Sequence, residues 1–429
     1  MNSLTTNSKG WWCGAVVLLL TLYALNAGAY SVLTHQELID LAWNDSIRPL
    51  LLAKFPGASE EQLRVAHAYA YGGCAIQDMG YYPFGKKFFS DLTHYVRSGD
   101  FVAWLFRNAK TMDEYAFAIG ALSHYLGDSI GHSEAINPAT SLAFPKLHRK
   151  FGPIVTYDQS PHGHVRTEFA FDVNGLANQD FAPLSYLKFI GFRVPRRFLA
   201  QAFINTYGFN IHEVLGRARP ALRSYRTAVR SFIPSFADAE VVLHGNDFPT
   251  PPDDEVFREF IEQVARTNYE RKWNHKNDGP GFRAHLLAIV VFLVPKIGAA
   301  SDLAIKIPTQ QTQGWYLQSV NHTVDEFRTL LRRLGTDPAL RLTNIDLDTG
   351  DRVKLRDYPR ADQAYARLLE RVTSKPGDPI PVDLQRDVLN YYANLSSTVK
   401  SEKRLQPLLT VLRGMKTVNG LEATGTQPE

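Results

Sequence analysis

Cysteine is nearly absent from this sequence, whose 429 residues include only Cys13 and Cys74. Cys13 lies in an N-terminal segment that we expect to be removed, so the mature chain would have no intramolecular disulfide available. A small secreted domain stabilised by disulfides is therefore excluded, and an exported chain of this kind needs another source of stabilisation.

A large excess of charge of one sign is also missing. The chain has 47 Lys and Arg against 43 Asp and Glu, a net charge of +4, which is too small to indicate a nucleic-acid-binding protein by itself. Hydrophobic residues make up 45% and charged residues 21% of the chain, which is typical of a soluble globular protein and excludes a disordered or collagen-like one.

Long apolar runs are few, and the first lies at the N-terminus. It extends from Trp11 to Leu25 behind Lys9 and precedes Ala27-Gly28-Ala29, the small-x-small pattern of a signal-peptidase site. We expect residues 1–29 to be a signal peptide, the mature chain to begin at Tyr30, and the protein to be exported to the periplasm or out of the cell. An uncleaved anchor is the alternative, but the run is shorter than the roughly 20 residues that a bilayer requires.

The second apolar run, Leu286 to Val294, ends at Pro295 and Lys296. It is too short to span a bilayer, and it indicates either a buried helix or a segment that lies on a membrane surface.

The spacing of apolar residues predicts a mainly α-helical fold. Residues 59–71, 113–126 and 254–269 carry apolar positions at helical spacing behind suitable N-cap residues. The clearest strand signal is 344–355, where apolar residues flank the turn Asp348-Thr349-Gly350-Asp351, so a short hairpin is expected there.

The expected organisation after the signal peptide has two parts. A Pro-rich and Gly-containing segment at 245–252 is the best linker candidate, which separates a domain at 30–245 from a helical C-terminal region at 253–414. Residues 415–429 lose periodicity and are expected to form a frayed tail.

Histidine is concentrated in one part of the chain. Eight of the 13 histidines fall between residues 35 and 164, and histidine is the commonest neutral metal ligand. They are His35, His67, His94, His124, His132, His148, His162 and His164.

Two of these histidines precede an acidic residue by four positions. His124 with Asp128, and His164 with Glu168, would each lie on one helix face, because four residues rise about 6 Å, or one turn. A single pair of this kind is common by chance and more often makes a surface hydrogen bond. Two pairs, together with isolated His and Asp residues, predict a metal site.

The order of these residues resembles that of the zinc-dependent phospholipase C and P1/S1 nuclease superfamily, whose members are secreted helical proteins with three zinc ions. The family order is an N-terminal residue, a nearby His, an Asp, a His, a His-xxx-Asp helix, another His and a His-xxx-acid helix. This chain has Tyr30, His35, Asp78, His94, His124 with Asp128, His132, and His164 with Glu168. Residues 72–83 and 169–173 look like a bacterial branch labelled zinc-dependent phospholipase C.

The resemblance implies three zinc ions and their ligands. One ion would be bound by Asp78, His94, His124 and Asp128, a second by His132, His164 and Glu168, and a third by His35, bridging Asp128 and the amine and carbonyl of Tyr30. It also suggests that Asp78 accepts a proton from the attacking water. Clustered zinc ions lower the pKa of such a water and neutralise charge on the phosphate.

The chain departs from the family pattern in two places. His132 follows Asp128 by four residues, whereas the family's next histidine usually follows by six, where this chain has Glu134, so either residue could be the ligand. Tyr30 replaces the usual Trp, but its ligating atoms belong to the backbone. Glu168 at the last position is the choice of the phospholipases, whereas the five-residue step from Tyr30 to His35 looks more like the nucleases.

Other candidate ligands have plainer interpretations. His67 lies on an apolar helix and is expected to be a core histidine, and Cys74 a small buried residue instead of a zinc thiolate. His148 and His162 lack a helical carboxylate partner, although His162 would be the first substitute for His164.

Three functions remain open at this point. The first is a secreted phospholipase C that acts on glycerophospholipids, with possible contact to a membrane surface through 286–294. The second is a P1/S1-like single-strand nuclease, which would use the same metals but usually carries disulfides and base-stacking pockets. The third is a zinc-binding protein without catalysis. No stable nucleic-acid complex is expected.

Overall fold

The computed structural model describes residues 31–82, 84–215, 218–229, 233–244, 246–249, 254–267, 288, 305–336, 341–395 and 400–423. The expected signal peptide, Tyr30, and the apolar segment 286–294 apart from Ala288 lie outside the described residues. The predictions for these segments therefore stay predictions.

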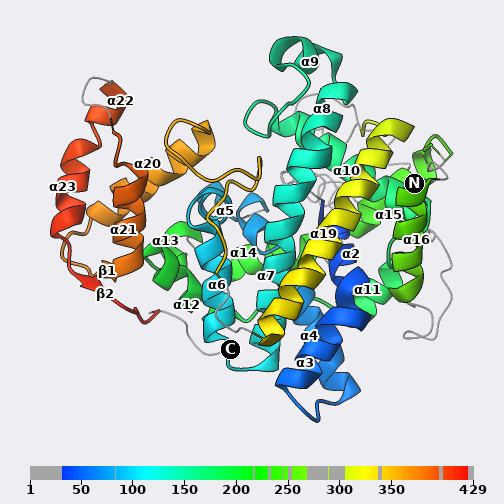
Figure 1. The fold of residues 1–429 in the computed structure, drawn as a ribbon, viewed down its shortest axis with the longest axis horizontal. Coiled ribbons are helices and arrows are strands. Elements are labelled where there is room, and N and C mark those ends of the chain that lie inside the picture. Colours follow the sequence, from blue (N-terminus) through cyan, green and yellow to red (C-terminus); the bar gives the residue numbers. More distant parts are fainter. Residues whose placement is uncertain are drawn as a thin grey trace, which may run out of the picture.

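The mainly α-helical class is confirmed, because helices make up almost all of the regular structure (Figure 1). In the described part of the chain, strands are limited to β1 (Ile380–Pro381) and β2 (Thr417–Val418), which pair in parallel with Ile380 opposite Thr417.

The first region carries the helices up to residue 244. They are α2 (Val32–Ala42), η1 (Trp43–Ile47), α3 (Arg48–Lys54), α4 (Glu60–Gly73), η2 (Gln77–Tyr81), α5 (Lys87–Tyr95), α6 (Ser98–Asn108), α7 (Met112–Gly131), η3 (His132–Ile136), α8 (Asn137–Ala143), α9 (Pro145–Phe151), α10 (Pro161–Ala177), α11 (Leu184–Ile190), α12 (Arg196–Tyr207), α13 (Ile211–Leu215), α14 (Ala218–Thr227) and α15 (Ile233–His244).

The C-terminal region carries the remaining helices. They are α16 (Glu255–Thr267), α19 (Gln310–Thr336), α20 (Pro359–Thr373), α21 (Val382–Tyr391), α22 (Lys400–Lys403) and α23 (Gln406–Gly414).

Local sequence explains where two of the predicted helices begin. Ser59 and Thr111 each form a capping box, in which the hydroxyl accepts the backbone N–H three residues later, from Gln62 or Glu114. Helix α4 thus begins as expected from the sequence. Helix α7 extends five residues beyond the predicted end at 126, to Gly131.

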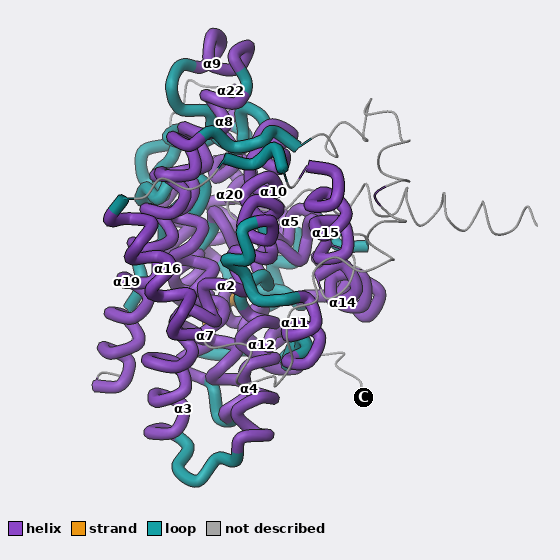
Figure 2. The backbone as a smooth tube through the Cα atoms, turned by 90° about the vertical axis from the view of Figure 1, so that its right-hand side faces the viewer, coloured by secondary structure: helices purple, strands orange, loops and turns teal. Residues whose placement is uncertain are grey.

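Helix α7 is the centre of the fold. It packs against α4, α2, α6 and α19, and Figures 1 and 2 show it surrounded by these helices. Its contact with α4 is unusually close, because a Cβ built on Gly120 would stand 2.1 Å from the carbonyl oxygen of Ala70. Only glycine allows the two backbones to approach this far.

The helices on both sides of the expected linker share one continuous hydrophobic core. Helix α19 lies along α7 and α2, while α20 packs against α5, and Figure 1 shows α20 to α23 gathered at one side of the molecule. The helices that carry the predicted ligands are therefore covered partly by the C-terminal region.

The hairpin expected at 344–355 is reduced to a single antiparallel bridge between Ile345 and Arg352. The reason is competition for its backbone groups: the Ile345 N–H donates to the Ser98 hydroxyl, and the Leu347 N–H donates to the carbonyl of His94. The segment is thus a loop that is bonded to the first region.

The tail expected to fray from residue 415 also differs. Met415 is buried, and strand β2 adds to β1. Pairing with β1 gives the backbone of β2 hydrogen-bond partners, and the sequence pattern did not predict this pairing. Within the described residues, no helix combines the length and the apolar character required to cross a bilayer.

Candidate metal centre

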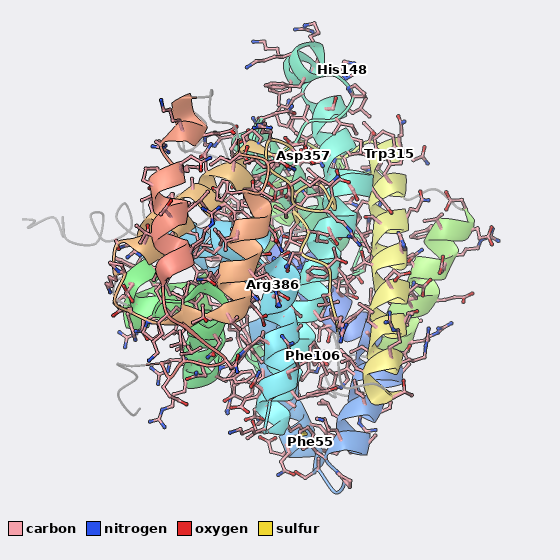
Figure 3. All side chains as sticks on the ribbon, turned by 60° about the vertical axis from the view of Figure 1, so that its left-hand side comes forward. Phe55, Phe106, His148, Trp315, Asp357 and Arg386 are labelled. Atoms are coloured by element: carbon pink, nitrogen blue, oxygen red, sulfur yellow. The ribbon has the colours of Figure 1, made fainter. Side chains whose placement is uncertain are left out.

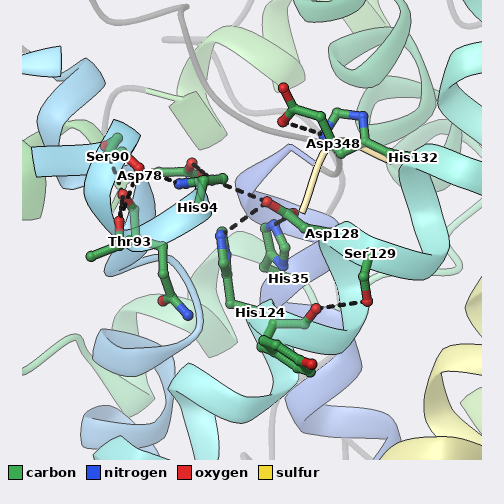
Figure 4. A network of polar contacts seen from close by, with 12 residues as sticks. His35, Asp78, Ser90, Thr93, His94, His124, Asp128, Ser129, His132 and Asp348 are labelled. Carbon is green, nitrogen blue, oxygen red and sulfur yellow. Dashed lines mark hydrogen bonds and ion pairs between the residues drawn. The ribbon is translucent and has the colours of Figure 1, made fainter. Parts of the chain in front are cut away.

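Four of the predicted ligands form one buried cluster at the middle of the fold. Asp78 comes from η2, His94 from α5, and His124 and Asp128 from α7, and each side chain is at most 1% exposed. One ligand atom from each lies within 4.8 Å of the others (Figure 4). Three elements thus converge on a volume the size of a metal site.

Backbone carbonyls set the orientation of two of these imidazole rings. Nδ1 of His94 lies 2.8 Å from the Ser90 carbonyl oxygen, and Nδ1 of His124 lies 3.0 Å from that of Cys74. Each Nδ1 therefore donates to a carbonyl, and Nε2 is the ring nitrogen that faces the carboxylates.

Asp128 faces histidines with both of its oxygens. Oδ2 lies 3.1 Å from Nε2 of His124 and 3.2 Å from Nε2 of His94, whereas Oδ1 lies 3.2 Å from Nε2 of His35. His35 belongs to α2 and stacks on His124 with ring centroids 4.3 Å apart. The two oxygens of one carboxylate are thus directed at two separate groups of nitrogen atoms.

The second cluster consists of His132, His164 and Glu168, all buried. Nδ1 of His164 lies 3.5 Å from Oε1 of Glu168, and its Nε2 lies 2.5 Å from the Val155 carbonyl oxygen. The four-residue offset therefore places both side chains on one face of α10, and the Val155 carbonyl fixes which nitrogen faces the cluster.

Residues 34–214 match the family model described as zinc dependent phospholipase C. This part of the chain is similar to that family. Neither the curated proteins nor the solved structures contain a match to the chain. The match indicates zinc-dependent phospholipase C hydrolase activity and implies a phospholipid substrate.

The chemistry of the two clusters fits the zinc that this family uses. Buried ligand atoms in both clusters lack a hydrogen bond, and leaving so many polar atoms unpaired is costly unless a cation joins them. The set combines imidazole nitrogen with carboxylate oxygen, which are zinc ligands. The unpaired atoms are Nε2 of His94 and His124, both nitrogens of His132, Nδ1 of His164, both carboxylate oxygens of Asp78 and of Asp128, and Oε1 of Glu168.

Burial sets the protonation of the second cluster. It lowers the pKa of His132 and of His164 to about 3, so both rings are neutral at pH 7 and can bind a metal. Burial, with the nearby charges of Asp128 and Asp78, raises the pKa of Glu168 well above its usual range. A cation is therefore needed for this carboxylate to be stable in its ionised form.

The first cluster has the opposite character. Burial alone would raise the pKa of Asp128, but the surrounding rings of His124, His35 and His94 hold it well below its usual range. Burial alone would lower the pKa of His94, but Asp128 and Asp78 raise it well above its usual range. The cluster thus stabilises positive charge beside Asp128, where a metal ion can replace the proton.

The start of the described chain lies beside this centre. Asp172, one turn beyond Glu168 on α10, accepts the backbone N–H groups of Leu33 and Thr34 at 2.9 and 3.0 Å. It also accepts the Thr34 hydroxyl at 2.7 Å, so Asp172 caps the N-terminus of α2 from a distant helix. This cap fixes the chain immediately after Tyr30, which lies outside the described residues.

His132, not Glu134, points into the centre. A π-helical turn at 132–136 continues α7, with His132 fully buried and Glu134 facing outward, where Oε1 lies 2.8 Å from Nδ1 of His322. Helix α7 runs unbroken to Gly131, so His132 lies one turn beyond Asp128 on the same helix face, whereas the usual six-residue spacing of the family pointed to Glu134.

The remaining histidines of the group lie outside both clusters. Nε2 of His67 lies 2.9 Å from Oδ1 of Asp40, and its ring stacks on Trp43, as expected of a core histidine. His162 is exposed, and Figure 3 shows His148 at the outer surface on α9. Cys74 is buried and takes no part in either cluster as a thiolate, but its carbonyl orients His124.

Sequence reasoning missed one carboxylate. Oδ1 of Asp348, from the loop after α19, lies 3.6 Å from Nε2 of His132 (Figure 4). The only signal in the sequence was the turn Asp348-Thr349-Gly350-Asp351, which we interpreted as the turn of a hairpin.

Proposed function

We propose that the protein is an exported phospholipase C that binds three zinc ions and cleaves glycerophospholipids between glycerol and phosphate. The observation that carries the proposal is the placement of Asp128, whose Oδ1 faces His35 while its Oδ2 faces His94 and His124. A carboxylate with its two oxygens directed at separate nitrogen groups is suited to bridging two ions, as in centres that hydrolyse phosphate esters.

The proposed ligand sets follow from the two clusters and from His35. Asp78, His94, His124 and Asp128 would bind the first ion, His132, His164 and Glu168 the second, and His35, Asp128 and the backbone amine and carbonyl of Tyr30 the third. The cap that Asp172 provides supports the third site, because it anchors α2 at the residues that follow Tyr30.

Hydrolysis needs a water that attacks phosphorus and a leaving glycerol oxygen that becomes protonated. Bound zinc ions would lower the pKa of the water and neutralise the developing charge on the phosphate oxygens. Asp78 is placed to take the proton from the water, because its buried carboxylate lies in the first cluster, with Oδ1 3.3 Å from Nε2 of His94. The oxygen of water then bonds to phosphorus, the bond to the glycerol oxygen breaks, and diacylglycerol leaves with a proton.

Export and contact with lipid are further parts of the proposal. Residues 1–29 have the pattern of a signal peptide, and the substrate class implied by the family is a membrane component. The apolar segment 286–294 is the candidate for contact with a membrane surface.

Metal analysis followed by parallel hydrolysis assays tests the proposal. The mature protein should contain three zinc ions per chain and should release phosphocholine from phosphatidylcholine vesicles, with no cleavage of single-stranded DNA or RNA. Cleavage of nucleic acid alone would establish the nuclease alternative. Zinc binding without hydrolysis of either substrate would support a non-catalytic zinc protein.

The third zinc has a test of its own, because it needs a free amine at Tyr30. A backbone amide nitrogen has no available lone pair, so a chain with Met or a tag before Tyr30 should retain less zinc and turn over more slowly than the mature protein. N-termini are verified by mass spectrometry. Equal zinc content and equal rates would exclude the Tyr30 amine as a ligand.

A further inference from the structure

The loop at 344–350 lies outside the residues that match the family, yet it is attached to the elements that carry the metal ligands. The Leu347 N–H donates to the carbonyl oxygen of His94 at 3.2 Å, and the Asn137 side chain donates to the carbonyl of Asp348 at 3.0 Å. A Cβ on Gly350 would stand 2.9 Å from the carbonyl oxygen of Ser129, next to Asp128. The loop therefore forms one wall of the centre.

Asp348 is held rigidly within this wall. Its side chain is 2% exposed, and Oδ2 accepts the hydroxyls of Tyr95 at 2.9 Å and of Tyr358 at 2.5 Å. Its backbone N–H donates to Oδ1 of Asp346 at 2.8 Å. With Oδ2 and the backbone fixed in this way, Oδ1 is directed at Nε2 of His132, 3.6 Å away.

His132 is the exception among the four histidines of the two clusters. His94, His124 and His164 each direct one ring nitrogen at a backbone carbonyl, which fixes the ring and determines which nitrogen is the ligand. Neither nitrogen of the His132 ring makes a hydrogen bond, although the ring is completely buried. Among the described residues, Asp348 is the only carboxylate within 4.0 Å of either nitrogen.

We propose that Asp348 is the positioning residue for His132: its Oδ1 accepts the Nε2 proton, so that Nδ1 is presented to the second metal ion together with His164 and Glu168. This inference rests on the proposed function. A carboxylate in this role fixes the orientation of a histidine ligand and increases its basicity, which strengthens metal binding. The metal centre would thus depend on a residue from the C-terminal region.

Zinc titration of the full-length mature protein against a chromophoric chelator tests this role without measuring turnover. The variants are Asp348→Asn, which keeps the shape of the side chain, Asp351→Asn as an exposed control in the same turn, and His132→Ala, which removes the ligand. Thermal unfolding of the metal-free proteins shows that each variant is folded.

Asp348→Asn should weaken one of the zinc sites by about 10 to 100 fold, while excess zinc still fills it. Asp351→Asn should bind zinc as the wild type does, and His132→Ala should lose the same site entirely. Equal zinc affinities in Asp348→Asn and the wild type would overturn this inference and leave the proposed function unaffected. A site in Asp348→Asn that no zinc concentration fills would also overturn it, because Asp348 would then be a ligand. A wild type that binds no zinc would overturn both this inference and the proposed function.

Discussion

Helix α2 in the first region and helix α20 in the C-terminal region are buried in different ways. All eleven residues of α2 are buried, among them His35, Glu37 and Asp40, whereas α20 buries one face and exposes the other. A helix that is polar in part and buried all round must satisfy its charged groups inside the protein. In α2, His35 meets this requirement at Asp128 in the candidate metal centre, and Asp40 meets it with Tyr71 and His67. Helix α20 follows the ordinary amphipathic pattern instead.

The same contrast holds for polar side chains in the two regions. In the C-terminal region, the buried Tyr365 and the partly buried Tyr391 donate to carboxylates, to Asp387 at 2.9 Å and to Asp362 at 2.5 Å. In the first region, a concentrated group of buried nitrogen and oxygen atoms lacks hydrogen bonds. Asp348 connects the two regions, because it is the C-terminal carboxylate that reaches this group.

The largest effect is expected from Asp128→Asn, which removes the central carboxylate. A neutral amide cannot bridge two divalent ions as a carboxylate does, so zinc should be lost and turnover should fall by about a thousandfold or more. Elemental analysis and phosphodiester hydrolysis measure the two effects. Asp325→Asn, at an exposed position of α19, is the matched control and should change neither. Full zinc content and an unchanged rate in Asp128→Asn would exclude Asp128 from the centre.

A second pair of variants separates a cluster residue from a core residue with similar burial. Glu168→Ala should lose one zinc ion, whereas His67→Ala should keep all zinc and lose stability. His67 stacks on Trp43 and pairs with Asp40, and leaving a buried partner unpaired costs about 1 to 3 kcal/mol. Zinc content and thermal unfolding measure the difference. Loss of zinc from His67→Ala would make that residue part of the centre.

A third prediction concerns a buried carboxyl outside both clusters. Burial raises the pKa of Asp180 to about 7, above its unfolded value near 4, so the folded state holds its proton more tightly. The free energy of unfolding should therefore fall by on the order of a few kcal/mol as pH rises from about 4 to 7. Below about pH 4, Asp180 is protonated in both states and should cause no change in stability. Asp180→Asn should remove this part of the pH dependence in urea unfolding at pH 4 to 8. An identical pH profile in the variant would contradict it.

The smallest effect is expected in the loop that carries Asp348. Gly350 has φ +78°, and an added Cβ would stand 2.9 Å from the Ser129 carbonyl oxygen, so Gly350→Ala should cost about 1 to 3 kcal/mol of unfolding free energy. Gly377→Ala has open space around the added methyl group and should be nearly neutral. Equal stabilities of the two variants would show that the loop is not held closely against α7.

Much of the candidate centre could be predicted because helical spacing is a local property. His124 with Asp128, and His164 with Glu168, lie four residues apart, and any regular helix brings such residues to one face. The choice between His132 and Glu134 could not be made this way. It depends on whether the helix continues past Asp128, and the structure shows that α7 runs to Gly131 and places His132 one turn beyond Asp128 on the same face.

The C-terminal region was harder to interpret from its sequence. The alternating pattern at 344–355 predicted a hairpin, but the backbone groups of Ile345 and Leu347 bond to Ser98 and His94 instead. Strand β2 was missed because its partner, β1, lies more than 30 residues earlier in the chain and each contributes only two residues. Tertiary contacts override weak local preferences in such short segments.

The sequence by itself determined the helical class, the two ligand pairs, and the order of residues that indicates a zinc-dependent phospholipase C, because these depend on spacing along the chain. Only the tertiary structure decided that Asp128 stands between His35 and the rings of His94 and His124, and that Asp348 reaches His132. Such contacts join residues up to 216 positions apart, and they depend on how α2, α5, α7 and the C-terminal loop pack together, which no local pattern encodes.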